Sequence, residues 1–163
     1  MRILTGLILA VLLLVSFVTF AEEGKVNFSG KWSLNSDKSL VQGLRTSAQI
    51  DLNIRHEGDS LSIDRIFQKP SGKVTVTRKF TLDGKVSENI ISGRPTKSFA
   101  NWSADGKTLV ILSTSVWERD GNKFETKTVE VWKLSEGGNS LLINSVSKSS
   151  RGVRKATYVY DKK

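Results

Sequence analysis

The feature that most constrains this chain is an alternation of apolar and polar residues that runs through most of it after residue 22. In residues 48–55 (AQIDLNIR) and 74–82 (VTVTRKFTL) every second side chain is apolar, with Arg78 as the exception. β-Strands with one dry face and one wet face need this period of two. No segment of helical length carries apolar residues at spacings of three and four. The chain is therefore predicted to be all-β.

Turn-forming residues divide the alternating segments at regular intervals. Eight groups rich in glycine, proline or aspartate follow the second strand, at 57–59, 70–72, 83–84, 93–95, 105–106, 120–121, 137–139 and 151–152. Tight turns between neighbouring strands impose antiparallel pairing. Closure of the sheet removes its two unpaired edges. We predict a single antiparallel meander β-barrel of about 8–10 strands.

A weak internal repeat supports the hairpin prediction. Residues 58–63, 106–111 and 138–143 share the pattern Gly-x-Ser/Thr-Leu-x-Ile. Because their spacing is unequal, they indicate one hairpin geometry used three times, not a solenoid. The connection over residues 35–47 is longer and alternates little. It fits either a short helical lid, with Ser36 or Asp37 as the N-cap and Gly43 as the end, or an ordered loop.

The first 21 residues have the pattern of an export signal. Arg2 is the only charge before Glu22, residues 3–20 are almost wholly apolar, and Ala21 ends the run. This pattern predicts a signal peptide over 1–21 and a barrel domain over 22–163, periplasmic or secreted. The alternative is an uncleaved anchor, because the apolar run is about long enough to span a bilayer. The chain has no cysteine, which excludes disulfides and a lipid-anchored lipoprotein.

The chain is basic, with a formal net charge of +9, and its lysines and arginines are scattered. Dispersed charge is typical of a solvated surface, and the alternative is attraction to an anionic surface. The aromatic residues lie among apolar strand residues and not between cations, which argues against a nucleic-acid-binding module.

Both ends of the barrel domain carry motifs of a known superfamily. Residues 28–34 (FSGKWSL) resemble the opening strand of calycins, the lipocalins and fatty-acid-binding proteins, and of exported bacterial proteins with a Phe-x-Gly-x-Trp-x-Leu strand. Residues 156–162 (ATYVYDK) are similar to the closing strand of fatty-acid-binding proteins. The resemblance implies that Gly30 and Trp32 close one barrel end, with Arg154 or Arg151 packed on Trp32.

In that closing strand the family uses an Arg-x-Tyr pair to grip a ligand carboxylate. Tyr160 stands where the family has its tyrosine, and Tyr158 replaces the arginine. The lipocalin Thr-Asp-Tyr motif is absent. The resemblance therefore implies a lipocalin-like barrel that binds a small molecule, with an altered carboxylate grip.

The sequence offers little to a catalytic or metal site. Its one histidine, His56, ends a strand beside a turn, where a surface or turn role is expected. The chain has no calcium-loop spacing, no Gly-x-Ser-x-Gly elbow and no phosphate-binding glycine loop. We expect a protein without cofactor or metal and without catalysis.

Two arginines share the apolar phase of their strands. Arg65 follows Leu61 and Ile63, and a turn over residues 70–73 would place it opposite Arg78. Two buried cations need a counter-charge, either Glu130 or an anionic ligand head group. The alternatives are a structural ion pair or arginines that reach out through the barrel mouth.

Other inward positions contrast large aromatic residues with small hydroxyls. The aromatics expected inside are Phe80, Trp102, Trp117, Trp132, Tyr158 and Tyr160. Serines at 113, 115, 145 and 147 share the apolar phase but cannot fill a barrel. They indicate a wet or ligand-filled half. The candidate ligand-binding residues are Arg65, Arg78, Phe80, Trp102, Trp117, Glu130, Tyr158 and Tyr160.

These patterns favour an exported, monomeric, non-catalytic protein that holds a small apolar or amphipathic ligand inside its barrel. The alternative is a filled barrel that contacts an anionic envelope surface or a partner protein through its basic exterior. An enzyme that uses the barrel as a reaction cavity, with Glu130 as its candidate carboxyl group, is the third hypothesis.

Overall fold

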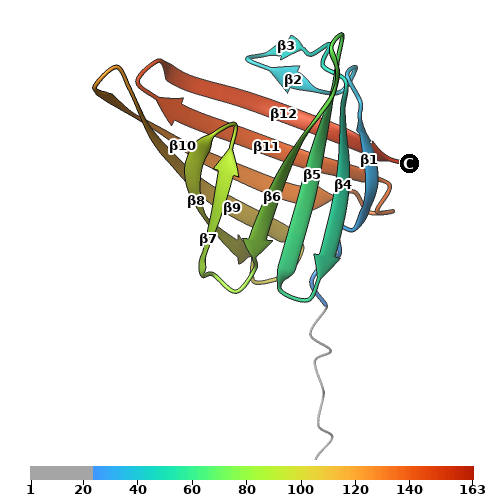
Figure 1. Ribbon diagram of the computed structural model, residues 1–163. Helices are drawn as coiled ribbons and strands as arrows, with labels where there is room; N and C mark the ends of the chain where they lie inside the picture. The colour runs from blue at the N-terminus through green and yellow to red at the C-terminus, as the bar shows by residue number, and fades with distance from the viewer. Residues whose placement is uncertain (1–23) are drawn as a thin grey trace, which may run out of the picture.

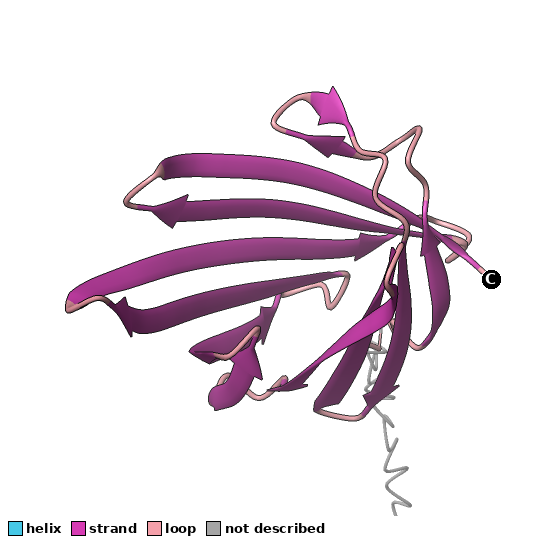
Figure 2. Ribbon diagram, turned by 45° about the horizontal axis from the view of Figure 1, so that its top comes forward, coloured by secondary structure: helices cyan, strands magenta, loops and turns pink. Residues whose placement is uncertain are grey.

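The computed structural model describes residues 24–163, which contain twelve strands and no helix, and thus no helix able to cross a membrane (Figures 1 and 2). The strands are β1 (Gly30–Leu34), β2 (Leu40–Val41), β3 (Leu44–Arg45), β4 (Ile50–Glu57), β5 (Ser60–Lys69), β6 (Gly72–Thr81), β7 (Val86–Ile91), β8 (Arg94–Trp102), β9 (Thr108–Arg119), β10 (Asn122–Leu134), β11 (Ser140–Ser149) and β12 (Gly152–Lys162). The predicted signal peptide over 1–21 lies outside the described residues, so the domain boundary and the export stay predictions.

The strands form one antiparallel sheet that curls into a nearly closed barrel. Hydrogen-bonded neighbours follow the order β6-β5-β4-β1-β12-β11-β10-β9-β8-β7. All neighbours on this path are consecutive strands except at β1, which pairs with both β4 and β12 and so joins the two ends of the meander. The predicted all-β antiparallel meander barrel is confirmed.

The connection after β1 contains a small hairpin, so of the two alternatives left open for it the helical lid is wrong. Gln42 and Gly43 have positive φ angles of 53° and 79° and turn the chain between β2 and β3. β2 pairs with Ala156 and Thr157 of β12. β1 pairs only with the last residues of β12, which leaves the earlier part of that strand edge without a neighbouring strand. The hairpin forms backbone hydrogen bonds with part of this edge.

Side chains close the seam between β6 and β7, which the ladder of backbone pairs leaves open. The Asn89 side chain accepts a hydrogen bond from the Lys79 N–H at 2.8 Å and donates one to the Lys79 carbonyl at 2.9 Å. The Ser87 hydroxyl accepts one from the Thr81 N–H at 2.8 Å. Asn89 thus takes the place of a backbone partner on β6.

We expect Asn89→Ala to lower the free energy of unfolding by about 2 kcal/mol, because two backbone groups lose their partners. Hydrogen exchange at the Lys79 amide should accelerate in the variant. Urea denaturation measures the first effect and exchange mass spectrometry the second. Asn53→Ala, on the fully paired strand β4, is the control, and an equal loss there would contradict the assigned role of Asn89.

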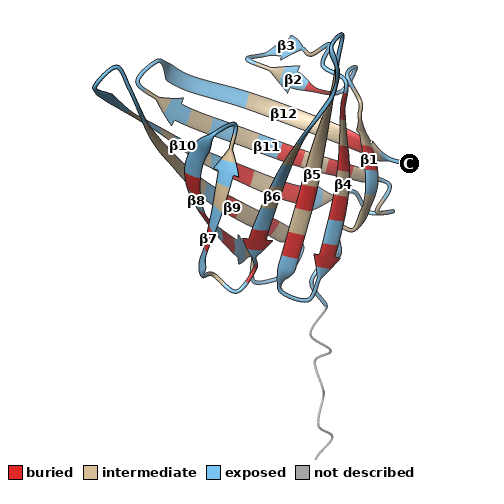
Figure 3. Ribbon diagram, in the orientation of Figure 1, coloured by how far each residue is buried: buried red, intermediate tan, exposed pale blue. Residues whose placement is uncertain are grey.

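The core lies at one end of the barrel and is built by the repeated hairpins. Each Gly-x-Ser/Thr-Leu-x-Ile repeat places its leucine and isoleucine in this core; the six residues are Leu61, Ile63, Leu109, Ile111, Leu141 and Ile143. Figure 3 shows buried positions gathered toward this end, while the far ends of the β9–β10 and β11–β12 hairpins are exposed. The repeat therefore marks the closed end of the barrel.

Trp32 plugs the closed end. Its Nε1 donates a hydrogen bond to the Phe28 carbonyl at 3.1 Å, and the Lys162 ammonium lies 5.6 Å from its ring centre. Gly30 has φ 143°, and a Cβ there would lie 3.5 Å from Trp32 Nε1. The cation over Trp32 is thus Lys162, and the expectation of Arg154 or Arg151 is wrong because Arg154 pairs with Ser147, well before the strand reaches Trp32.

His56 is buried at the same end, which corrects the expectation of a surface residue. Its ring packs against Phe28 and Trp102, with 6.0 and 5.8 Å between centroids, and those two rings lie 5.7 Å from each other. Its Nδ1 accepts the Phe28 N–H at 3.3 Å. Burial lowers the pKa of His56, which favours the neutral ring that this acceptor role requires. His56 is thus part of the packing.

Candidate functional site

A cavity of about 290 Å³ occupies the interior beyond the core. The inward side chains change there from aliphatic to polar along β9 and β11. On β9, Leu109 and Ile111 are buried in the core, whereas Ser113 and Ser115 line the cavity. β11 follows the same course, with Leu141 and Ile143 in the core and Ser145 and Ser147 at the cavity. The polar half that the serines predicted is therefore present as a cavity.

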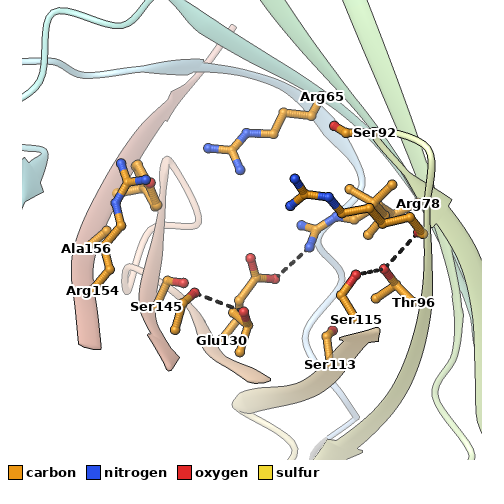
Figure 4. A pocket seen from close by; sticks show the side chains of 15 residues that line it. Arg65, Arg78, Ser92, Thr96, Ser113, Ser115, Glu130, Ser145, Arg154 and Ala156 are labelled. Carbon is orange, nitrogen blue, oxygen red and sulfur yellow. Dashed lines mark hydrogen bonds and ion pairs between the residues drawn. The ribbon is translucent and has the colours of Figure 1, made fainter. Parts of the chain in front are cut away.

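Four guanidinium groups and one carboxylate line the cavity: Arg65, Arg78, Arg94, Arg154 and Glu130 (Figure 4). Arg78 Nη1 donates to Glu130 Oε2 at 3.1 Å, and the two side chains are only 14% and 9% exposed. The same oxygen accepts Trp132 Nε1–H at 3.3 Å. Glu130 is thus the counter-charge of Arg78, which was one of the two alternatives predicted from the sequence. In the described part of the chain, none of the other three arginines pairs with a carboxylate.

The predicted register between β5 and β6 is wrong by two residues. Lys69 pairs with Gly72 and not with Val74, because the turn holds only Pro70 and Ser71. Arg65 therefore lies opposite Val76, and Arg78 lies opposite Ile63. This offset keeps the two arginines from facing each other directly while leaving both on the cavity wall.

Arg65 is a buried cation without a carboxylate partner. Its guanidinium carbon lies 5.2 Å from the ring centres of both Phe67 and Tyr158, and its buried Nε has no hydrogen-bond partner among residues 24–163. Burial raises the pKa of nearby Tyr160 to about 12, so this hydroxyl is neutral and supplies no negative charge near pH 7. Arg65 interacts with Tyr158 and, without a direct ion pair, with Glu130, so an anion that enters the cavity would supply its first carboxylate contact.

Arg94 is a functional candidate that the sequence did not reveal. Its guanidinium lies 4.0 Å from the Trp117 ring centre, and Trp117 stacks on Phe124 at 5.7 Å. Arg119 covers the other side, 6.0 Å from the Phe124 ring centre. Arg94 lines both the main cavity and a smaller pocket of about 140 Å³ beside this stack. The sequence Gly93-Arg94-Pro95 is typical of a turn, so Arg94 was not recognised as the first residue of a strand that faces the cavity.

Hydroxyl groups fill the remaining wall as cross-strand pairs. Thr96 and Ser115 lie 2.9 Å apart, and Thr128 and Ser147 lie at the same distance. A hydroxyl that donates to its neighbour still has lone pairs and can reorient its hydrogen. This wall can therefore accept or donate to a polar ligand.

The other predicted site residues are divided between the two ends of the barrel. Tyr158 and Arg154 line the cavity, and Trp117 lines the pocket beside it. Phe80 and Tyr160 are buried in the core. Trp102 lies near the opposite end, in a pocket with His56, and its buried Nε1 has no hydrogen-bond partner within the described part of the chain. Residues 24–163 contain no cluster of three potential metal ligands.

Comparisons with known proteins add a likeness of fold only. No family model matches the chain, and no curated protein matches it. Zebrafish ileal bile acid-binding protein, solved in complex with cholic acid, aligns at 17% identity over 83% of this chain and 98% of its own, with a TM-score of 0.47. Human cRBP IV aligns at 16% identity over 82% of this chain and 97% of its own, with a TM-score of 0.48.

Proposed function

We propose that this protein is an exported, non-catalytic binding protein whose barrel holds a small amphipathic ligand, with the anionic end of the ligand against the arginines. The observation that carries the proposal is Arg65, a buried guanidinium with an unpartnered Nε beside the cavity. Four arginines and one carboxylate line the cavity, so an incoming anion would offset part of an excess of positive charge. Guanidinium groups bind carboxylate and phosphate with paired hydrogen bonds.

The rest of the lining favours an amphipathic molecule over a wholly apolar one. Ile91, Ala156 and Tyr158 supply apolar surface, whereas the serines and threonines supply hydrogen-bonding groups. A volume of about 290 Å³ is at the lower end of small-molecule sites. Of the apolar and amphipathic ligands that the sequence left open, the cavity therefore suits a short chain or small ring with one acidic group.

Arg65→Gln is expected to weaken decanoate binding at least about 30-fold, because one partner of a desolvated charge pair is removed. Titration calorimetry with decanoate measures the affinity, and decanol, which has the same chain length without the charge, tests the need for an anion. Arg55→Gln is the matched control, because Arg55 lies on the outside of β4 and pairs with Asp64 at 3.4 Å. Equal binding of decanol and decanoate, or equal losses in the two variants, would refute the proposal.

A further inference from the structure

The outer surface of the barrel has two unlike walls. On β4, β5 and β6 the outward cross-strand neighbours are polar apart from Ile66, as in the row Asn53, Asp64 and Thr77. On β7 to β11 one row is apolar throughout: Val86, Phe99, Leu112, Val129 and Val146. These five residues, called here the apolar row, are cross-strand neighbours in register, so they lie side by side over five strands.

The apolar row is accessible in the described structure. Each of its five side chains is between 36% and 46% exposed. Isolated apolar residues are common on protein surfaces, but a contiguous set is typical of a surface that contacts a partner or a membrane. The opposite wall shows that this barrel can cover its exterior with polar residues, so the apolar row is not a requirement of the fold.

Lysines border the apolar row on one side. Lys97, Lys127 and Lys148 lie two residues nearer the cavity end, in the next outward row on β8, β10 and β11. Glu88 pairs with Lys97 at 3.2 Å and Glu125 pairs with Lys127 at 3.1 Å, both exposed. Lys148 forms no ion pair with a carboxylate in the described part of the chain, nor does Lys155, which lies beside Val146 and ends the row.

We propose that this wall docks on the surface of an anionic lipid bilayer, with the apolar row in the interfacial layer and the lysines at the phosphates. The positive charge of the wall favours an anionic bilayer over a second copy of the chain. Two copies of the wall placed face to face would bring Lys148 and Lys155 toward like charges, in a chain of net charge +9. An anionic bilayer offers both apolar depth and opposite charge. The inference is independent of the ligand in the cavity.

The test uses the chain from Glu22 onward, which contains every strand, and vesicles of phosphatidylcholine with and without phosphatidylglycerol. We expect co-sedimentation with the anionic vesicles that weakens as salt rises, and little with phosphatidylcholine alone. Leu112→Thr with Val129→Thr should reduce binding about tenfold, because apolar burial is lost. Val74→Thr is the control, because Val74 is 39% exposed on β6, on the opposite side of the barrel from the apolar row.

A second variant tests charge without touching the apolar row. Lys148→Gln with Lys155→Gln should lower binding to the anionic vesicles about 30-fold, since each interfacial lysine contributes about 1 kcal/mol. Binding that is absent from both vesicle types, or unchanged in both double variants, would overturn the proposal. A dimer in sedimentation equilibrium that dissociates in Leu112→Thr with Val129→Thr would also overturn it and assign the wall to a second copy of the chain.

Discussion

Replacing Glu130 by Gln is expected to lower the free energy of unfolding by about 3 kcal/mol, because it leaves buried cations without their counter-charge. Glu130 Oε2 accepts hydrogen bonds from Arg78 and from Trp132 Nε1. An amide oxygen can still accept both of these bonds, so the change isolates the charge. Arg78 and the unpaired Arg65 would then share one cavity with no carboxylate.

Urea denaturation of the purified barrel measures this loss. Glu88→Gln is the control for removing a carboxylate from an exposed ion pair, and it should change stability by less than about 0.5 kcal/mol. If the cavity is an anion site, decanoate should stabilise Glu130→Gln more than it stabilises the unaltered protein, since a bound carboxylate replaces the missing charge. Similar losses in both glutamine variants would show that the Arg78–Glu130 pair is not effectively desolvated.

Much of this site could be predicted from the alternation of the sequence. A period of two assigns each side chain to the inside or the outside. It therefore placed Arg65, Arg78 and Glu130 inside, and it identified the serines of β9 and β11 as a polar lining. The need of a buried cation for a counter-charge then connected Arg78 to Glu130, which lies 52 residues away.

Alternation predicts whether a side chain faces the inside or the outside of the barrel, but not how far along the barrel axis it lies. Tyr158 and Tyr160 have the same phase, yet Tyr158 lines the cavity and Tyr160 is in the core. Depth depends on register, which a two-residue turn sets, and the turn after Lys69 was assigned too many residues. The β6–β7 seam depends on side-chain bonds of Asn89 and Ser87, for which a pairing pattern gives no signal.

Alternation also does not separate the tryptophans by depth, and Trp32 and Trp117 differ most in their expected roles. Trp32→Ala is expected to lower the free energy of unfolding by about 4 kcal/mol, because a large buried side chain leaves a cavity at the closed end. The Phe28 carbonyl also loses the hydrogen bond from Trp32 Nε1. The affinity of the remaining folded protein for decanoate should be unchanged, since Trp32 is not among the residues that line the cavity.

Trp117→Ala is the matched substitution at the other end and should behave in the opposite way. Trp117 is half-buried and contacts Phe124 and Arg94, so its loss should cost only about 1 kcal/mol of stability. Arg94, however, loses the ring 4.0 Å away that holds its guanidinium at the cavity, and decanoate affinity should fall about threefold. Thermal unfolding and calorimetry on both variants separate the two roles. Loss of affinity in Trp32→Ala but not in Trp117→Ala would place the anion site at the closed end, beside His56 and Trp102.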